Sequence, residues 1–516
     1  IFAGVACREA PSGGFHPHGR GGSAARLKPG NMSPAAVTAV VLAYIALLFL
    51  IAWLSGRHAD NAGFFTGNRR SSWFVTALSM ITAAMSGVTY LSVPGSVAAD
   101  SFSYMQMVLG FTVGQLVVAS LLVPLFYRMR VISLYQYLDH RFGVTAQRTG
   151  AWFFFLSKML GAALRLYIVC AVMQLLVFDR AGLPFAANAV VTVLFVWLYT
   201  RRGGVKSLIW TDAFKTLCLV ASLVLTILAL VRGLGLTTGE ALREVAASEY
   251  ARIFFFDDPS SERYFWKMFV AGIVLLVAMT GLDQDMMQRN LSCRTPRDAQ
   301  KNIVLTALCQ IAVIFLFLTL GALLYLYMAR VGMPLPPKSD QVFSQVAVNG
   351  GLPLYVGLLF VLGMMASTYS SAGSSLTALT TSFTVDLLDA TRRCDEAQLT
   401  RTRRRVHALM ALGLTLLVLL FGRFGNDSVI NLFFKVAGYT YGPILGMFLF
   451  GICTRRRIDG RWLPLVAVAA PLLSALLQYA AGELFGYRIG FELLLYNALL
   501  TMGGMWLLGR KKRIQS

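Results

Sequence analysis

Long apolar segments alternate with short polar loops along nearly the whole chain. A run of roughly 20 apolar residues can cross a bilayer as one helix, and about thirteen such runs are present. They cover residues 34–55, 73–97, 103–127, 149–178, 183–200, 205–231, 266–290, 302–329, 353–388, 406–422, 428–453, 462–483 and 489–509. Since a membrane segment must satisfy its own backbone hydrogen bonds, the pattern predicts an all-α polytopic membrane protein.

Arginine and lysine gather in every second loop. The first basic loop holds Arg57, Arg69 and Arg70, and the last basic run is 510–513. The positive-inside rule therefore predicts an N-terminus outside and a C-terminus inside. The net charge of +22 is explained by this topology, with anionic membrane lipid as the neighbour and no nucleic acid as a partner. With 57% hydrophobic and 14% charged residues, the chain is not a soluble globular protein.

Two of the apolar segments are interrupted. Ser86-Gly87 lies in the middle of 73–97, and Gly281 is followed by two aspartates in 266–290. Such breaks permit an unwound backbone, whose carbonyls bind an ion where they line a cavity. The alternatives are a straight helix that tolerates one glycine and, for the second segment, an ordinary cytoplasmic end of the span.

The interrupted segments open two stretches of five spans each, 73–231 and 266–453. The first stretch starts inside and the second outside, so the two have opposite orientations. This is the pattern of an inverted repeat, with the substrate near the midplane between the broken helices. Span 34–55 is then an extra N-terminal helix, and 462–509 supplies two C-terminal helices.

The N-terminal segment and the cysteines give no indication of a further domain, metal site or disulfide. Residues 1–31 precede Met32 and are expected to be a disordered tail or an artefact, without a metal tract at His16 and His18. The seven cysteines are scattered and show no metal or disulfide pattern.

Span 353–388 carries serines where leucines are expected. Ser367, Ser370, Ser371 and Ser374 are spaced i, i+3, i+4 and i+7 and therefore share one helical face. Their oxygens suit a hard monovalent cation. The alternative is a stripe of small residues that lets neighbouring helices approach closely.

Five runs match the pattern of a known family. They are GNRRSSWFVTALSMITAAMSGVTYLSVPG (67–95), YTRRGGVKSLIWTD (199–212), DQDMMQRNL (283–291), MASTYSSAGSSLTALTTSFTVDLL (365–388) and GYTYGPILGMFLFGI (438–452). From Met32 to the C-terminus the chain resembles the sodium/solute symporter family. The resemblance implies one symporter domain, 32–516, with a LeuT-like five-plus-five inverted repeat.

In that family a sodium ion lies between the first and eighth core helices. The resemblance assigns this site to the carbonyls of Thr82, Met85 and Ser367 and to the hydroxyls of Ser370 and Ser371. Sodium is thus the predicted coupling ion, and the ion site is favoured over a packing stripe.

Some members bind a second sodium through the aspartate of a WTD motif. Asp212 matches that aspartate, and Ser370 and Ser374 match two further oxygens, whereas Gly373 replaces a side-chain ligand found in such members. Lys215 lies one turn from Asp212 and is able to pair with it. A salt-bridged Asp212 without an ion is therefore the alternative.

Lys158 and Arg165 are seven residues apart and share one face of span 149–178. An arginine at this depth faces the bundle interior and an anionic partner. That partner is either Asp283 or Asp285, in a structural pair, or a substrate carboxylate, which a guanidinium binds bidentately.

Arg165 falls where the family's sialic acid symporters carry their carboxylate-binding arginine, and Ser86 and Thr89 match their hydroxyl contacts. Sugar-transporting members usually have Asn and Tyr around a glutamine, where this chain has two aspartates around Gln284. The predicted substrate pocket consists of Arg165, Ser86, Thr89, Gln106, Asp283 and Gln284.

The chain is thus predicted to be a sodium-coupled symporter of the cell membrane that imports a carboxylate-bearing sugar such as sialic acid, as a monomer or loose homo-oligomer. The alternatives are a neutral sugar or polyol symporter, a proton-coupled transporter that uses Asp212 and Lys215, and a transporter-like ligand sensor. A sensor is disfavoured because no signalling domain follows the last span before Ser516. No catalytic triad or P-loop is present, so an enzyme is not expected.

Overall fold

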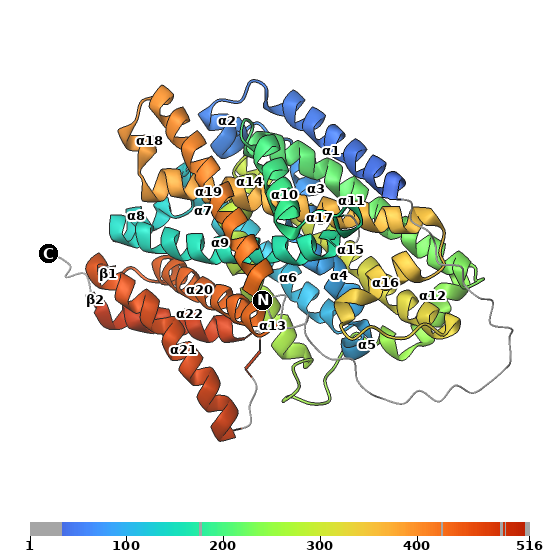
Figure 1. Cartoon of the computed structure of the whole chain (residues 1–516). Coiled ribbons are helices and arrows are strands. Elements are labelled where there is room, and N and C mark those ends of the chain that lie inside the picture. The colour runs from blue at the N-terminus through green and yellow to red at the C-terminus, as the bar shows by residue number, and fades with distance from the viewer. Residues whose placement is uncertain (1–33, 175–177, 425–426, 486–488, 491, 511–516) are drawn as a thin grey trace.

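The computed structural model describes residues 34–174, 178–424, 427–485, 489–490 and 492–510 (Figure 1). Nearly all of this part is helical, which confirms the predicted all-α class. The predicted N-terminal tail lies outside the described residues.

The helices of the first half are α1 (Pro34–Gly56), α2 (Asn61–Thr66), η2 (Gly67–Arg69), α3 (Trp73–Ala84), α4 (Gly87–Gly95), α5 (Val97–Asp100), α6 (Tyr104–Val117), η3 (Val118–Leu122), α7 (Val123–Met129), α8 (Gln136–Phe142), α9 (Val144–Met173), η5 (Asp179–Ala181), α10 (Phe185–Thr200), α11 (Val205–Gly233), α12 (Thr238–Ala247) and η6 (Glu249–Ala251).

The second half contains α13 (Phe265–Leu276), η7 (Val277–Gly281), α14 (Gln284–Asn290), α15 (Pro296–Val331), η8 (Ser339–Gln341), α16 (Val342–Asn349), α17 (Leu354–Ser382), η9 (Phe383–Leu387), α18 (Ala390–Arg393), α19 (Glu396–Phe424), α20 (Asp427–Cys453), η10 (Gly460–Trp462), α21 (Leu463–Phe485) and α22 (Leu493–Leu508). Two-residue strands β1 (Arg457–Ile458) and β2 (Gly509–Arg510) pair antiparallel, with Arg457 opposite Arg510.

Eight helices of the described residues are long and apolar enough to cross a membrane, or up to ten if each of two bent pairs forms one span. The described residues also form three shorter apolar helices, which are α10, the 439–453 part of α20, and α22. The multi-pass character is therefore clear. The number of thirteen spans, the inside and outside assignment and the five-plus-five repeat stay predictions.

Both predicted interruptions are confirmed. Helices α3 and α4 meet at an angle of 63°, and the α13–η7 helix meets α14 at 70°. Ser86 caps α4 by accepting a hydrogen bond from the amide of Thr89, and Asp283 caps α14 by accepting one from the amide of Asp285. Asp283 and Asp285 are only 1% and 4% exposed, so they are not an ordinary cytoplasmic edge.

Glycines let each broken span approach the other half of the chain closely. A Cβ atom at Gly110 of α6 would overlap the carbonyl of Phe269 in α13, and one at Gly272 would overlap the carbonyl of Met107. On the other side, a Cβ atom at Gly321 of α15 would lie 2.5 Å from the carbonyl oxygen of Pro94 in α4. Backbone-to-backbone packing of this kind is how membrane helices associate tightly.

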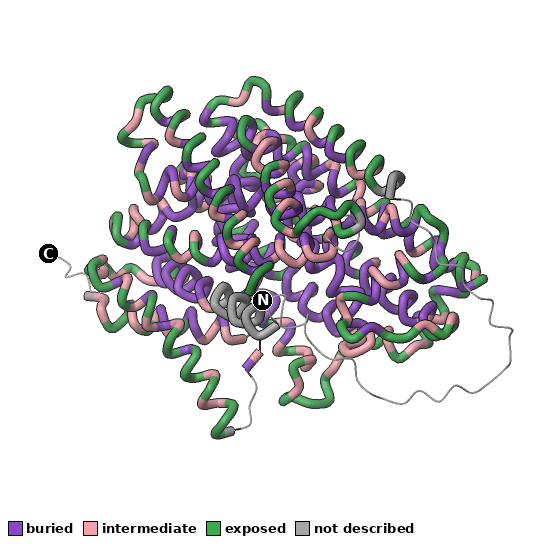
Figure 2. The backbone as a smooth tube through the Cα atoms, viewed as in Figure 1, coloured by how far each residue is buried: buried purple, intermediate pink, exposed green. Residues whose placement is uncertain are grey.

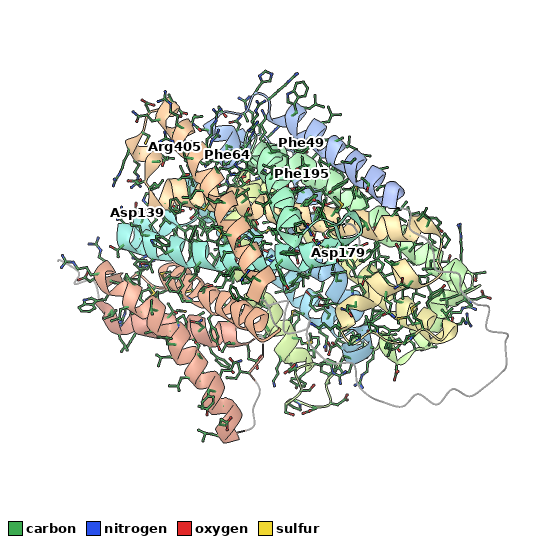
Figure 3. The ribbon with its side chains drawn as sticks, viewed as in Figure 1. Phe49, Phe64, Asp139, Asp179, Phe195 and Arg405 are labelled. Atoms are coloured by element: carbon green, nitrogen blue, oxygen red, sulfur yellow. The ribbon has the colours of Figure 1, made fainter. Side chains whose placement is uncertain are left out.

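The periphery differs from this core. Helices α1 and α21 are exposed along much of their length (Figure 2), and α1 contacts α10 through an edge-on pair of Phe49 and Phe195, 6.3 Å between ring centroids (Figure 3). Outward apolar side chains such as Leu472 and Leu484 suit a lipid environment. The site must therefore be sought in the core between the broken spans.

The segment between α15 and α16 packs on α4. Tyr325 donates a hydrogen bond to the carbonyl of Gly95, 2.6 Å, and a Cβ atom at Gly95 would overlap the carbonyl of Ser339. Asp340 lies in this contact, outside the spans. Burial raises its pKa from 3.8 to about 6, while neighbouring Ser92 and Lys338 partly oppose the rise.

We expect Gly272→Ala to lower the melting temperature of the detergent-solubilised protein. The added methyl group would overlap backbone atoms, which cannot move aside as a flexible side chain can. Overpacking of this kind costs about 1–3 kcal/mol. Gly503→Ala in α22 is the matched control, since nothing lies within 4 Å of its Cβ position. Equal melting temperatures for both variants would contradict the close crossing of α6 and α13.

Asp340 makes stability depend on pH. Below about pH 4 the folded and unfolded states both carry the proton, and between about pH 4 and pH 6 only the folded state keeps it, so stability falls as pH rises. Asp340→Asn should therefore stabilise the protein at pH 7.5, by at most about 3 kcal/mol at 1.36 kcal/mol per pKa unit, and not at pH 4.

Thermal unfolding across this pH range measures the difference. Asp258→Asn is the control, because hydrogen bonds from Ser260 lower the pKa of this exposed carboxyl group. A stabilisation by Asp340→Asn that grows as pH falls would refute the assignment.

Candidate functional site

A cavity lies between the two broken spans. Its apolar lining comes mainly from α6 and from the α13–α14 region and includes Met107, Phe111, Leu275, Leu276, Met279 and Met286, with Ala83 and Ala84 from the end of α3. Its polar lining includes Lys158, Arg165, Asp283, Asp285, Ser371 and Tyr441, from α9, the second helix break, α17 and α20. The cavity therefore combines buried charge with an apolar wall, as small-molecule sites do.

Lys158 is held between the two aspartates of the second break. Its Nζ atom lies 3.0 Å from Oδ2 of Asp283 and 2.9 Å from Oδ2 of Asp285. Tyr441 donates a further hydrogen bond to Oδ2 of Asp283, 2.6 Å. All three charged side chains are at least 95% buried, and Lys158 is the opposite charge that both carboxylates share.

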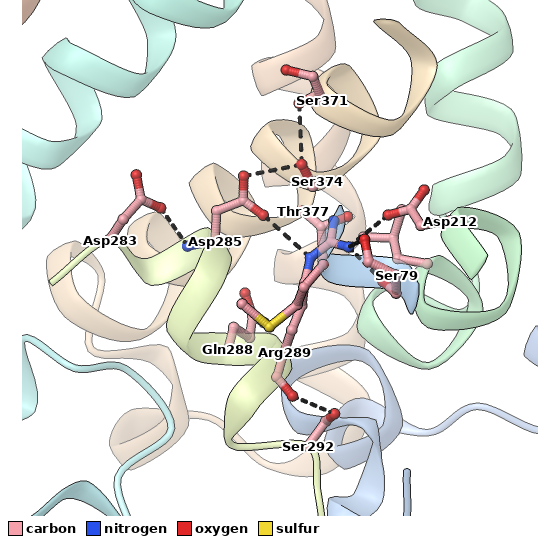
Figure 4. A network of polar contacts seen from close by, with 12 residues as sticks. Ser79, Asp212, Asp283, Asp285, Gln288, Arg289, Ser292, Ser371, Ser374 and Thr377 are labelled. Carbon is pink, nitrogen blue, oxygen red and sulfur yellow. Dashed lines mark hydrogen bonds and ion pairs between the residues drawn. The ribbon is translucent and has the colours of Figure 1, made fainter. Parts of the chain in front are cut away.

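Arg289 continues this arrangement from Asp285 toward Asp212 (Figure 4). Its Nε atom lies 3.7 Å from Oδ1 of Asp285, and its Nη1 atom lies 2.7 Å from Oδ2 of Asp212 and 2.6 Å from the hydroxyl of Ser79. Lys215 completes the series, with Nζ 2.9 Å from Oδ1 of Asp212. We call Asp283, Lys158, Asp285, Arg289, Asp212 and Lys215 the charge chain.

The six members of the charge chain alternate in sign and sum to zero. They join α9, α11 and α14, and each has a neighbour of opposite charge. In a low-dielectric interior, removal of one partner leaves a buried charge uncompensated, which costs several kcal/mol.

Arg165 is not part of the chain. Its Nε atom donates to the carbonyl of Gly161, 2.9 Å, one turn earlier in α9. Among the described residues no carboxylate forms an ion pair with it. The aspartates of the second break pair with Lys158 instead, so the guanidinium of Arg165 is left as an uncompensated positive charge on the cavity wall.

The serine stripe of α17 lies against the first helix break. Ser371 lines the cavity, and Ser374 donates to Oδ2 of Asp285, 3.0 Å. The hydroxyl of Ser370 is buried and has no hydrogen-bond partner among the described residues. The hydroxyl of Ser367 donates to the carbonyl of Met364 within its own helix, 3.1 Å.

The other predicted sodium ligands lie on α3 and just after it. Because α3 ends at Ala84, the last carbonyls of the helix, including that of Thr82, lack the amide that would follow in a longer helix. Met85 has an extended backbone at the break. The Thr82 hydroxyl bonds the carbonyl of Asp212, 3.1 Å, and ties α3 to α11. The structure thus provides oxygens on both elements, and the ion site itself stays a prediction.

The second predicted sodium site has a different environment. Asp212 is fully buried and paired with both Lys215 and Arg289, and the hydroxyl of Ser374 is used by Asp285. The predicted alternative, an aspartate bridged to Lys215, is the arrangement observed. A second sodium ion at Asp212 stays a prediction that requires these pairs to rearrange.

Four of the six residues of the predicted substrate pocket lie outside the lining of this cavity. Gln106 accepts from the amide of Phe255, 3.0 Å, and donates to the carbonyl of Arg263, 3.0 Å. Gln284 accepts from the amide of Leu134, 2.9 Å, and donates to the carbonyl of Ile132, 3.2 Å. Both amides thus bond the backbone of loops, and their role as substrate contacts stays a prediction.

The other two residues outside the lining, Ser86 and Thr89, bond each other at the start of α4, with 3.3 Å between their hydroxyl oxygens. Arg165 and Asp283 are the members of the predicted pocket that line the cavity.

Sequence reasoning missed Arg289 and Tyr441. The i, i+4 spacing of Asp285 and Arg289 was a usable signal for a helical pair. No local pattern indicates that Arg289 also reaches Asp212, or that Tyr441 reaches Asp283, because these contacts join distant segments.

Comparison with known proteins agrees with this architecture. The model of the sodium:solute symporter family matches residues 64–459. The human sodium/iodide cotransporter is 28% identical over 419 residues, which is 77% of this chain and 62% of that protein. Sodium-coupled monocarboxylate transporter 2 of Danio rerio is 25% identical over 440 residues, 83% of this chain and 68% of that protein.

The sodium-dependent multivitamin transporter of Oryctolagus cuniculus is 26% identical over 397 residues, 75% of this chain and 60% of that protein. The chain thus spans about three fifths to two thirds of these relatives. The substrate-bound, outward-open structure of a Na⁺-coupled sialic acid symporter superposes with a TM-score of 0.79 at 18% identity and covers 91% of this chain and 97% of that one. This likeness shows a shared fold.

The charge chain predicts that removing one charge lowers stability more than removing an oppositely charged pair. Lys215→Met leaves the chain with one excess negative charge and should cost about 3–5 kcal/mol of stability. Asp212→Asn/Lys215→Met leaves the remaining four charges balanced and should cost less than the sum of the single variants. Melting temperatures of the four proteins form a double-mutant cycle, and strict additivity would contradict the coupling.

Proposed function

The chain belongs to the sodium:solute symporter family, and we propose that it imports a small organic anion together with sodium ions. The resemblance based on the five sequence runs is confirmed at the level of the family, and so is the prediction of a transporter fold. The relatives are cotransporters and transporters by name, in line with the expectation that the chain is not an enzyme.

The observation that carries the proposal is the uncompensated charge of Arg165. The charge chain is neutral by itself, and Arg165, which is only partly buried on the cavity wall, adds one positive charge beside it. A guanidinium in a cavity of low polarity favours an anionic ligand and matches a carboxylate with two parallel hydrogen bonds. A carboxylate-bearing solute is therefore favoured over a neutral sugar or polyol. Sialic acid is one such solute.

The proposed sodium site joins α17 to the first helix break. Its ligands are the carbonyls of Thr82, Met85 and Ser367 and the hydroxyls of Ser370 and Ser371. The unpartnered hydroxyl of Ser370 supports an ion there. Because Ser371 also lines the cavity, ion and substrate occupy neighbouring positions. Sodium binding therefore fixes one wall of the substrate cavity, and loss of sodium on the inward side loosens it.

Energetics bear on the number of ions. A monoanion carried with one sodium moves no net charge and gains only the sodium gradient, about 1.4 kcal/mol for a tenfold ratio. A second sodium, bound by Asp212, Ser370 and Ser374, adds about 1.4 kcal/mol for its own tenfold gradient and about 2.3 kcal/mol for the one net charge that then moves through 100 mV. The total driving force rises to about 5.1 kcal/mol. We place this second ion in a state of the transport cycle in which Asp212 has left Lys215 or Arg289.

Uptake of radiolabelled carboxylates into proteoliposomes tests the proposal, with an inward sodium gradient and with choline in place of sodium at constant pH. Arg165→Gln should weaken uptake of any carboxylate at least 30-fold, which corresponds to the loss of about 2 kcal/mol or more for a buried charge pair. Ser371→Ala should raise the sodium concentration that gives half-maximal uptake. The controls are Arg202→Gln and Ser120→Ala, both at exposed positions.

Uptake that continues unchanged in choline would refute sodium coupling. Uptake that survives Arg165→Gln would refute the carboxylate role, and the sodium assignment would then stand on its own.

A further inference from the structure

A second concave surface lies between α13 and α22, apart from the central cavity (Figure 1). Its lining residues are Trp266, Lys267, Val270, Ala271 and Val274 on α13 and Glu492, Leu495 and Tyr496 on α22. We call this surface the α13–α22 groove. None of its residues lines the central cavity. Trp266 and Val270 are 55% and 43% exposed, so the groove opens on the outer surface of the helix bundle.

The apolar part of the groove follows one face of α13. Trp266, Val270 and Val274 are spaced i, i+4 and i+8 and form a stripe about 12 Å long at a rise of about 1.5 Å per residue. Gly272, at which α13 crosses the backbone of α6, is two residues and thus about 200° round the helix from Val270. Helix α13 is therefore packed on α6 by one face and open to the groove by the opposite face. In a membrane, an open apolar face meets lipid acyl chains.

The polar part of the groove lies where both helices begin. Lys267 is the third residue of α13, and Glu492 is the N-cap residue of α22. Trp266 precedes Lys267, and Tyr496 lies one turn after Glu492. Tryptophan and tyrosine are enriched at the level of the lipid headgroups. This end of the groove therefore lies at the membrane surface, and the apolar stripe extends from it toward the hydrocarbon.

The charges at this end have opposite signs, so the end is neutral overall. The ammonium of Lys267 donates to the carbonyl of Ser260, 3.1 Å, and an ammonium carries three donors in all. Lysine binds phosphate as a point charge, and a carboxylate accepts strong hydrogen bonds from a cation. The groove thus combines a binding group for an anion, a binding group for a cation and an apolar stripe.

We propose that the α13–α22 groove binds one phospholipid with an ethanolamine headgroup. One acyl chain lies along the stripe of α13, Lys267 binds the phosphate, and Glu492 binds the primary ammonium. A glycerol headgroup supplies no cation to Glu492, and a choline headgroup supplies a cation without N–H donors. The inference does not rest on the proposed function, because no residue of the groove belongs to the predicted ion or substrate sites.

The bound lipid acts on the helix that leads to the second break. Helix α13 continues through η7 to Gly281 and Asp283, and the lipid fills the space between α13 and α22. A ligand that binds the folded chain and not the unfolded chain stabilises the fold. Ethanolamine phospholipid should therefore raise the melting temperature of the protein.

Native mass spectrometry and thermal unfolding of the delipidated full chain test the inference. Dioleoyl phosphatidylethanolamine, phosphatidylcholine and phosphatidylglycerol are added separately. The ethanolamine lipid should form a one-to-one complex that is about tenfold tighter than either of the others, the ratio that one hydrogen bond to a charged group supplies. It should also raise the melting temperature more than either of them.

Three variants separate the parts of the groove. Glu492→Gln should weaken binding of the ethanolamine lipid to the level of the choline lipid. Lys267→Gln should weaken all three lipids, because they share the phosphate. Val270→Asn places an amide in the apolar stripe and should also weaken all three. The melting temperature of each variant without lipid shows whether it is folded.

The matched controls are Glu483→Gln, Lys301→Gln and Val190→Asn, at exposed positions outside the groove, and they should bind the ethanolamine lipid like the wild type. Equal affinity for the three headgroups, or tighter binding of the glycerol lipid, overturns the ethanolamine assignment. Equal weakening by Val270→Asn and Val190→Asn overturns the groove as the binding site.

Discussion

The structure depends on a row of buried charges that must alternate in sign. Placing ionised groups inside a membrane protein is costly unless each has an opposite partner. In the charge chain, Lys158 joins the two aspartates of the second helix break, and Arg289 and Lys215 share Asp212. The chain thus ties α14 and its N-cap Asp283 to α9 and α11 at the second break.

The net charge of the cavity wall depends on the neutrality of the charge chain. Among the described residues that line the cavity, Arg165 is the one charged side chain outside the neutral charge chain, and we propose that it sets the sign of the ligand. Ser374 connects the chain to α17 through Asp285, and Ser371 lies one turn away on the same helix. Helix α17 with its proposed sodium ligands, the charge chain and the cavity are therefore neighbours. An ion or a substrate at one of the proposed positions would alter the electrostatics of the others.

Much of the architecture was predictable from sequence, because membrane burial makes polar residues conspicuous. Ser86-Gly87 and Gly281 marked both helix breaks, and the serine spacing of α17 marked one face. The hydrogen-bond and ion-pair partners of individual polar side chains were not predictable. Gln106 and Gln284 were expected in the pocket, yet loop backbone groups use their amides. Arg289 was visible in the sequence, but its pairing with Asp212 depends on how separate helices pack, which no local spacing reports.

The central claim is that an uncompensated Arg165 makes the cavity selective for an anion. Calorimetry in sodium with hexanoate and with its uncharged amide, hexanamide, tests it most directly, because the two ligands have nearly the same shape and differ by one charge. The account predicts that hexanoate binds and that hexanamide binds at least 30-fold more weakly, the ratio that corresponds to about 2 kcal/mol for a buried charge pair. Equal binding of the two ligands would show that the charge of Arg165 is compensated in some other way and would contradict the account.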